Sequence, residues 1–77
     1  MTINYKPNVE WHAEPTDEAR ADYKGQVQRL SNTDIYDDTL DLAGGDNYDG
    51  CYTHHGQLVY NLLREELDSR LKAIGFL

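Results

Sequence analysis

The spacing of apolar residues predicts an amphipathic helix in the last third of the chain. From His54 to Ile74, apolar side chains recur every three or four residues, which is the repeat of one helical face. Thr53 is placed to cap the first turn, and Gly75 to end the helix. The stripe consists of Val59, Tyr60, Leu63, Leu67, Leu71 and Ile74, whereas Leu58 and Leu62 lie off it.

A second helix is predicted from Thr16 to Leu30. Thr16 is a suitable N-cap, and Asp17 and Glu18 follow in the first turn, where the helix dipole favours acidic side chains. Apolar residues recur on one stripe, although Gly25 weakens the helix by about 1 kcal/mol relative to alanine. The stripe consists of Ala19, Tyr23, Val27 and Leu30.

The segment from Asp34 to Ala43 fits a short helix better than a strand. When residues are placed about every 100°, the four aspartates share one narrow face: Asp34, Asp37, Asp38 and Asp41. The apolar residues then cover the other side, whereas a strand would mix the two kinds on one face. Thr33 could cap this helix, Gly44 follows as a C-cap, and residues 44–50 form a loop by composition.

The N-terminal residues 2–13 alternate with period two, which is typical of strands. Ile3 and Tyr5 alternate before a Pro7-Asn8 turn signal, and Val9, Trp11 and Ala13 alternate after it. A lone pair of strands is barely stable in water, so it would have to pack on a helix. We therefore predict a single α+β domain over residues 1–77, with a mainly α fold as the alternative.

The net charge of the chain is concentrated in one segment, Asp34 to Gly50, which we call the acidic window. The chain has a formal net charge of −7, and the segment from Asp34 to Gly50 carries six aspartates without a lysine or arginine. Like charges on one helical face repel by a few tenths of a kcal/mol per pair. Tyr36, Tyr48 and Tyr52 are interleaved with these acids, and aromatic residues are common anchors at protein interfaces.

The window therefore predicts a surface that meets lysines and arginines, although a solvated acidic face is the alternative. Its carboxylates have a linear density of the same order as the phosphates of DNA, which predicts imitation of nucleic acid. The expected contacts are the carboxylates of Asp34, Asp37, Asp38, Asp41, Asp46 and Asp49, with the three tyrosines as anchors. We expect reversal of Asp37 and Asp38 to lysine to abolish binding and to leave the fold intact.

In size, charge and layout the chain resembles the small acidic inhibitors encoded by phages, including DNA mimics that block host nucleic-acid-binding proteins. The resemblance rests on the acidic window and its tyrosines and on no diagnostic motif. It implies a non-enzymatic inhibitor, active in the cytoplasm of a bacterial host, that occupies a basic nucleic-acid-binding protein and binds neither nucleic acid nor membrane itself. The alternative is an acidic adaptor or antitoxin-like module that caps a basic partner without imitating DNA.

Other chemistry is less well supported by the sequence. The DNYDG stretch lacks two key carboxylates of a calcium loop, and Cys51, His54 and His55 offer fewer than the four ligands of a structural zinc site. No motif marks a catalytic pocket or a cofactor, so we predict no enzyme. Whether Cys51, His54 and His55 bind a metal stays open.

Length and cysteine content bound the remaining possibilities. A single cysteine, Cys51, excludes an intramolecular disulfide and favours a reducing compartment. We expect neither a signal peptide nor a membrane span. Because a 77-residue chain buries a modest core, a homodimer through the C-terminal helix is a further hypothesis.

Overall fold

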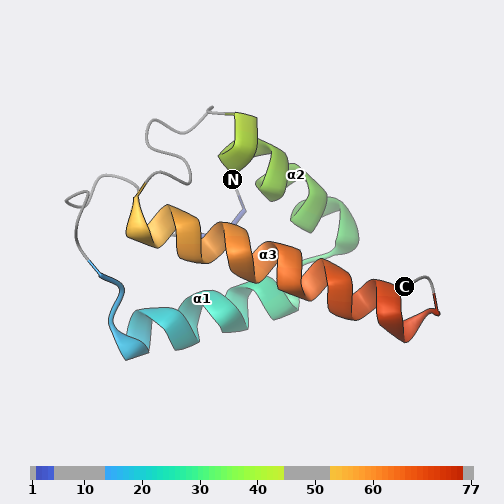
Figure 1. Cartoon of the computed structure of the whole chain (residues 1–77), viewed down its shortest axis with the longest axis horizontal. Coiled ribbons are helices and arrows are strands. Elements are labelled where there is room, and N and C mark those ends of the chain that lie inside the picture. Colours follow the sequence, from blue (N-terminus) through green and yellow to red (C-terminus); the bar gives the residue numbers. More distant parts are fainter. Residues whose placement is uncertain (1, 5–13, 45–52, 76–77) are drawn as a thin grey trace.

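The described residues form three helices, and the longest of these lies between the other two. In the computed structural model, which describes residues 2–4, 14–44 and 53–75, the helices are α1 (Asp17–Arg29), α2 (Asn32–Gly44) and α3 (His54–Ala73). Helix α3 packs against both α1 and α2, which lie on its two sides (Figure 1). None of the helices in the described ranges is long and apolar enough to cross a membrane.

The prediction of an α+β fold is wrong, and the mainly α alternative fits. The described residues contain no strand, and the chain bends at Ile3. The backbone N–H of Ile3 donates to a side-chain carboxylate of α2 instead of to another strand. An alternating pattern predicts extended backbone but does not specify what pairs with it. Residues 5–13, which carry the rest of the predicted pair, lie outside the described residues.

Two of the three predicted N-terminal helix caps are confirmed. The Thr16 hydroxyl accepts from the Ala19 N–H at 3.1 Å, and the Thr53 hydroxyl accepts from the Gly56 N–H at 3.0 Å. For α2 the cap is Ser31 and not Thr33, because the Ser31 hydroxyl accepts from the Asp34 N–H at 3.1 Å. The helix therefore begins at Asn32, two residues before the predicted start.

The core is a cluster of side chains from all three helices and the N-terminal segment. Tyr23 and Val27 come from the predicted stripe of α1, and Ala19 and Leu30 of that stripe pack around them. The buried hydrophobic residues are Ile3, Tyr23, Val27, Ile35, Leu42, Val59 and Leu63. This small core agrees with the expectation for a chain of this length.

The second half of α3 extends past the core. Leu67 is 37% exposed and Ile74 is 76% exposed, although both belong to the predicted stripe. Leu58 and Leu62, which we expected to lie off the core face, pack against the core instead. The helix ends at Ala73, one residue before the predicted Ile74, and Gly75 follows the C-cap with a φ of +77°, which is favourable for glycine.

Candidate functional site

The acidic face of α2 is turned so that one of its edges lies in the core. Ile35, Asp38 and Leu42 share the inward side, and each of them is at most 2% exposed. The four aspartates of the predicted acidic face form an arc around the helix, because successive residues are about 100° apart. This acidic arc runs from the inward side toward the surface. Asp38 is buried, Asp34 and Asp41 are half-buried, and Asp37 is exposed.

The carboxylate of Asp38 has a structural partner inside the protein. Its Oδ1 accepts from the Thr2 N–H at 2.8 Å, and its Oδ2 accepts from the Ile3 N–H at 3.0 Å. Two charge-assisted hydrogen bonds compensate for removing this carboxylate from water. Asp38 therefore fixes the N-terminal segment to α2, and the expectation that its reversal leaves the fold intact no longer holds.

The outward side of α2 carries an aromatic and an aliphatic residue next to an acid. Tyr36 is 63% exposed and Leu40 is 51% exposed, and they stand four residues apart on the helix, which makes them neighbours. Asp37 and Thr33 are exposed beside them. We call this set of four residues, Thr33, Tyr36, Asp37 and Leu40, the α2 surface.

Sequence reasoning placed Tyr36 among the contact residues but missed Leu40. Leu40 belongs to the apolar residues on the side of the helix opposite the aspartates, and its residue type is typical of a core. Its spacing of four residues from Tyr36 was the available signal. Asp46, Asp49, Tyr48 and Tyr52, the remaining predicted contacts, lie outside the described residues.

The charged residues of α2 are all acidic. Among the described residues, the ion pairs join Glu14 to Arg20 and His54, and Glu66 to Arg70. Asp34 and Asp37 take part in none of these ion pairs. Because α2 itself carries no lysine or arginine, the repulsion between these acids is not relieved within the helix.

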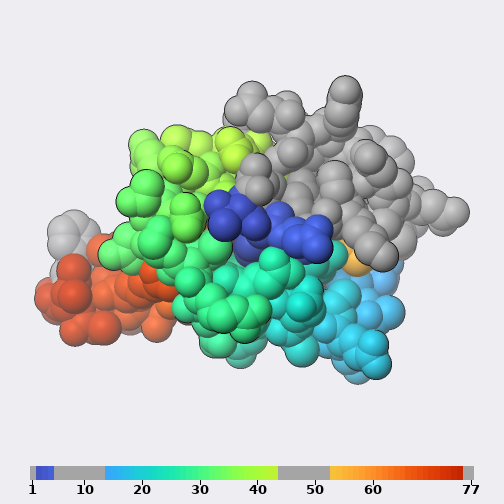
Figure 2. Space-filling model, turned by 180° about the vertical axis from the view of Figure 1, so that it is seen from behind, coloured from blue at the N-terminus to red at the C-terminus, as the bar shows by residue number. Residues whose placement is uncertain are grey.

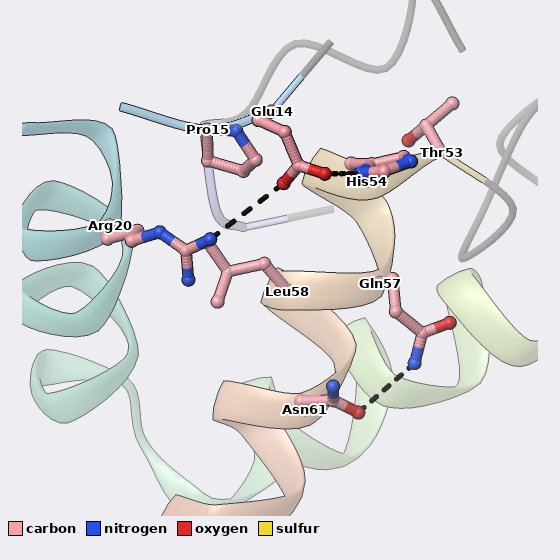
Figure 3. A pocket seen from close by; sticks show the side chains of 8 residues that line it. All are labelled: Glu14, Pro15, Arg20, Thr53, His54, Gln57, Leu58 and Asn61. Carbon is pink, nitrogen blue, oxygen red and sulfur yellow. Dashed lines mark hydrogen bonds and ion pairs between the residues drawn. The ribbon is translucent and has the colours of Figure 1, made fainter. Parts of the chain in front are cut away.

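A separate open pocket of about 380 Å³ lies between the start of α1 and the start of α3 (Figure 3). Glu14 stands between His54 and Arg20 there, with its carboxylate 2.5 Å from Nδ1 of His54 and 3.9 Å from the Arg20 guanidinium. Gln57 donates to Asn61 on the same wall at 3.2 Å. Glu14 also lies near the N-terminus of α3, where an acid is favoured by the helix dipole.

This pocket lies between two helices, and we assign no catalytic function to it. Among the described lining residues, Thr53 has a hydroxyl group, but that group is fully buried and caps α3. A nucleophile and base must lie within hydrogen-bond reach of each other and of a substrate. The geometry of Glu14, Arg20 and His54 therefore explains how the segment before α1 is held against α3.

The two neighbouring histidines have different partners. His54 pairs with Glu14 at the pocket, whereas the buried His55 forms a hydrogen bond of 2.6 Å between its Nδ1 and the Tyr23 hydroxyl. Cys51 lies outside the described residues. Within the described ranges, no three His, Cys, Asp or Glu side chains come together to hold a metal ion.

Comparisons with known proteins do not identify a relative: no protein-family model, curated protein or solved structure matches the chain.

Proposed function

We propose that this protein is a non-enzymatic binding module that docks on a basic partner protein through the α2 surface. The observation that supports this most directly is the exposure of Tyr36 and Leu40, at 63% and 51%, beside Asp37. An aromatic and an aliphatic side chain next to an acid have the composition of an interface core with a charged rim. The module acts by occupying its partner.

The energetics of docking follow from these residues. Burying the exposed part of a side chain such as Tyr36 or Leu40 contributes on the order of 1 kcal/mol each. Lysines or arginines of the partner would relieve the repulsion between Asp34 and Asp37, and such contacts mainly steer association and weaken with salt. The affinity therefore depends on the apolar pair, and the choice of a basic partner depends on the acids.

The partner class that we propose is a nucleic-acid-binding protein, since such proteins carry basic surfaces. Two modes of binding differ in what the acids do. Imitation of DNA needs a continuous row of carboxylates, whereas Asp38 is 1% exposed and the outward side of α2 is partly apolar. These features favour the mode in which the module caps a basic partner without imitating DNA.

Capture from a bacterial lysate with matched variants tests the role of the α2 surface. We expect the variants Tyr36→Ala and Asp37→Lys each to retain roughly tenfold less partner than the wild type, a difference of about 1.4 kcal/mol. The control is Asp68→Lys, which changes the net charge equally at an exposed position of α3. Equal capture by all three variants would show that the α2 surface is not the binding site.

A competition experiment separates the two modes once a partner is captured. Duplex DNA should displace a protein that imitates it, because both occupy the same groove. In the capping mode, duplex DNA leaves the complex intact at constant ionic strength. Comparison at low and high salt then measures how much of the affinity is electrostatic.

A further inference from the structure

The N-terminal segment is bound to the rest of the protein as a short peptide is bound to a receptor. Thr2, Ile3 and Asn4 lie in the seam between α1 and α2, where Figure 2 shows them in blue against the two helices. Their contacts come from residues more than twenty positions away in the chain. The seam is therefore a tertiary site and not a local turn.

One side of the seam is formed by Asp38, whose carboxylate receives two successive backbone N–H groups. The bonds from Thr2 and Ile3 measure 2.8 and 3.0 Å, and Asp38 is 1% exposed. Both oxygen atoms are used, one for each N–H. A carboxylate buried in this way needs donors, so the seam is built to be occupied.

The other side is formed by Gln26, which binds both backbone groups of Asn4. Its Oε1 accepts from the Asn4 N–H at 2.9 Å, and its Nε2 donates to the Asn4 carbonyl at 3.2 Å. Asp22 fixes the orientation of this amide by accepting from Nε2 at 2.8 Å. Gln26 therefore recognises the backbone groups of one residue and not a particular side chain.

The single side chain that enters the core from this segment is that of Ile3. It is 4% exposed and belongs to the same buried cluster as Ile35 and Leu42 of α2. Four hydrogen bonds to main-chain atoms and one aliphatic side chain thus define the ligand. A segment of another chain that bends in the same way, with an aliphatic residue at the same place, would satisfy the same groups.

We infer that the seam between α1 and α2 is a binding site for a peptide that bends at a central aliphatic residue, and that residues 2–4 are its built-in, displaceable occupant. A ligand needs the groups that residues 2–4 supply. These are two N–H groups for Asp38, the N–H and carbonyl of one residue for Gln26, and an aliphatic side chain for the core. The site uses the inward edge of α2, so it is distinct from the α2 surface and does not depend on the proposed function.

An attached occupant competes strongly with a free one. A tethered segment acts at an effective concentration in the millimolar range, so an external peptide binds weakly to the intact protein. Weakening the attached segment at Ile3, without changing the receptor groups, should open the site to a peptide that retains the isoleucine.

The experiment uses the full chain with Ile3→Ala and a fluorescent peptide with the sequence of residues 1–8. We expect saturable binding that is roughly tenfold or more tighter to Ile3→Ala than to the wild type, because the alanine segment competes less well. A peptide carrying Ile3→Asp should not bind. Circular dichroism of each variant establishes that it is folded.

Matched variants test the receptor groups. In the Ile3→Ala background, Asp38→Asn should lose roughly tenfold or more in affinity, since an amide cannot accept from both N–H groups. Asp37→Asn, the same change at the neighbouring exposed position, should bind as Ile3→Ala does. If the Asp38 variant is unfolded, Gln26→Met tests the other side of the seam and should also weaken binding. The inference is overturned if Ile3→Ala binds no peptide, or if neither receptor variant differs from Asp37→Asn.

Discussion

At the scale of single residues, two adjacent aspartates show that residue type does not determine role. Asp37 and Asp38 have the same side chain, and both belong to the acidic arc of α2. Asp37 is exposed, whereas Asp38 is buried and holds the backbone of Thr2 and Ile3. One is available for a partner protein, and the other is part of the fold.

This difference gives a prediction about stability. Replacing Asp38 with alanine leaves the two backbone N–H groups without their acceptor, so the free energy of unfolding should fall by about 2–3 kcal/mol. The matched change Asp37→Ala should stay within about 0.5 kcal/mol of the wild type. Urea unfolding followed by circular dichroism measures both, and equal effects would contradict the structural role of Asp38.

At the scale of elements, the helices were predictable wherever local signals agree. Helices α1 and α3 and their threonine caps were predicted from a few adjacent residues, and the structure confirms them. For α2, two hydroxyl residues, Ser31 and Thr33, were both close enough to the start to cap it. The choice between them depends on where the preceding helix ends, which the local pattern does not specify.

The cap of α2 therefore gives a test at the element scale. Ser31→Ala removes the hydroxyl that accepts from the Asp34 N–H, and it should destabilise the protein by about 1 kcal/mol. Thr33→Ala, at an exposed position inside the first turn, should change the stability by no more than about 0.5 kcal/mol. Thermal unfolding of the two variants decides which residue is the cap, and a larger loss for Thr33→Ala would overturn the assignment.

At the scale of the whole molecule, Arg70 connects α3 to the turn between α1 and α2. Its guanidinium donates to the carbonyl of Leu30 at 2.8 Å, to the side chain of Asn32 at 2.7 Å and to Glu66 at 2.9 Å. It also donates to the carbonyl of Gln28, in the last turn of α1, at 3.3 Å. A carbonyl near the end of α1 is thus satisfied by a residue forty positions away in the chain.

Arg70→Lys tests this connection, because lysine keeps the charge but lacks the planar fork of donors. We expect a loss of about 1–2 kcal/mol in the free energy of unfolding. The matched control is Arg64→Lys, since Arg64 donates to Tyr60 on its own helix, a bond that raises the pKa of Arg64 above its ordinary value. If both changes have the same effect in urea unfolding, Arg70 does not hold the turn.

The exposed end of α3 also belongs to this scale. Leu67 and Ile74 lie on the apolar stripe but are exposed, and the C-terminal end of α3 extends past α1 and α2 (Figure 1). The homodimer through the C-terminal helix stays a prediction. The residues that could form its seam are now these two, since Leu58 and Leu62 pack against the core.

The sequence by itself determined the helices, because periodicity and caps depend on residues within a turn or two of each other. It also determined the excess of acid on α2, since charge is a property of composition. Only the tertiary structure decided which side of α2 faces inward. That choice depends on Ile35 and Leu42 reaching the shared core and on Asp38 meeting backbone donors 35 and 36 residues away. No local pattern contains such distant partners. The neighbouring residues in the chain therefore could not show that the Asp38 carboxylate is buried or that the Tyr36 side chain is exposed.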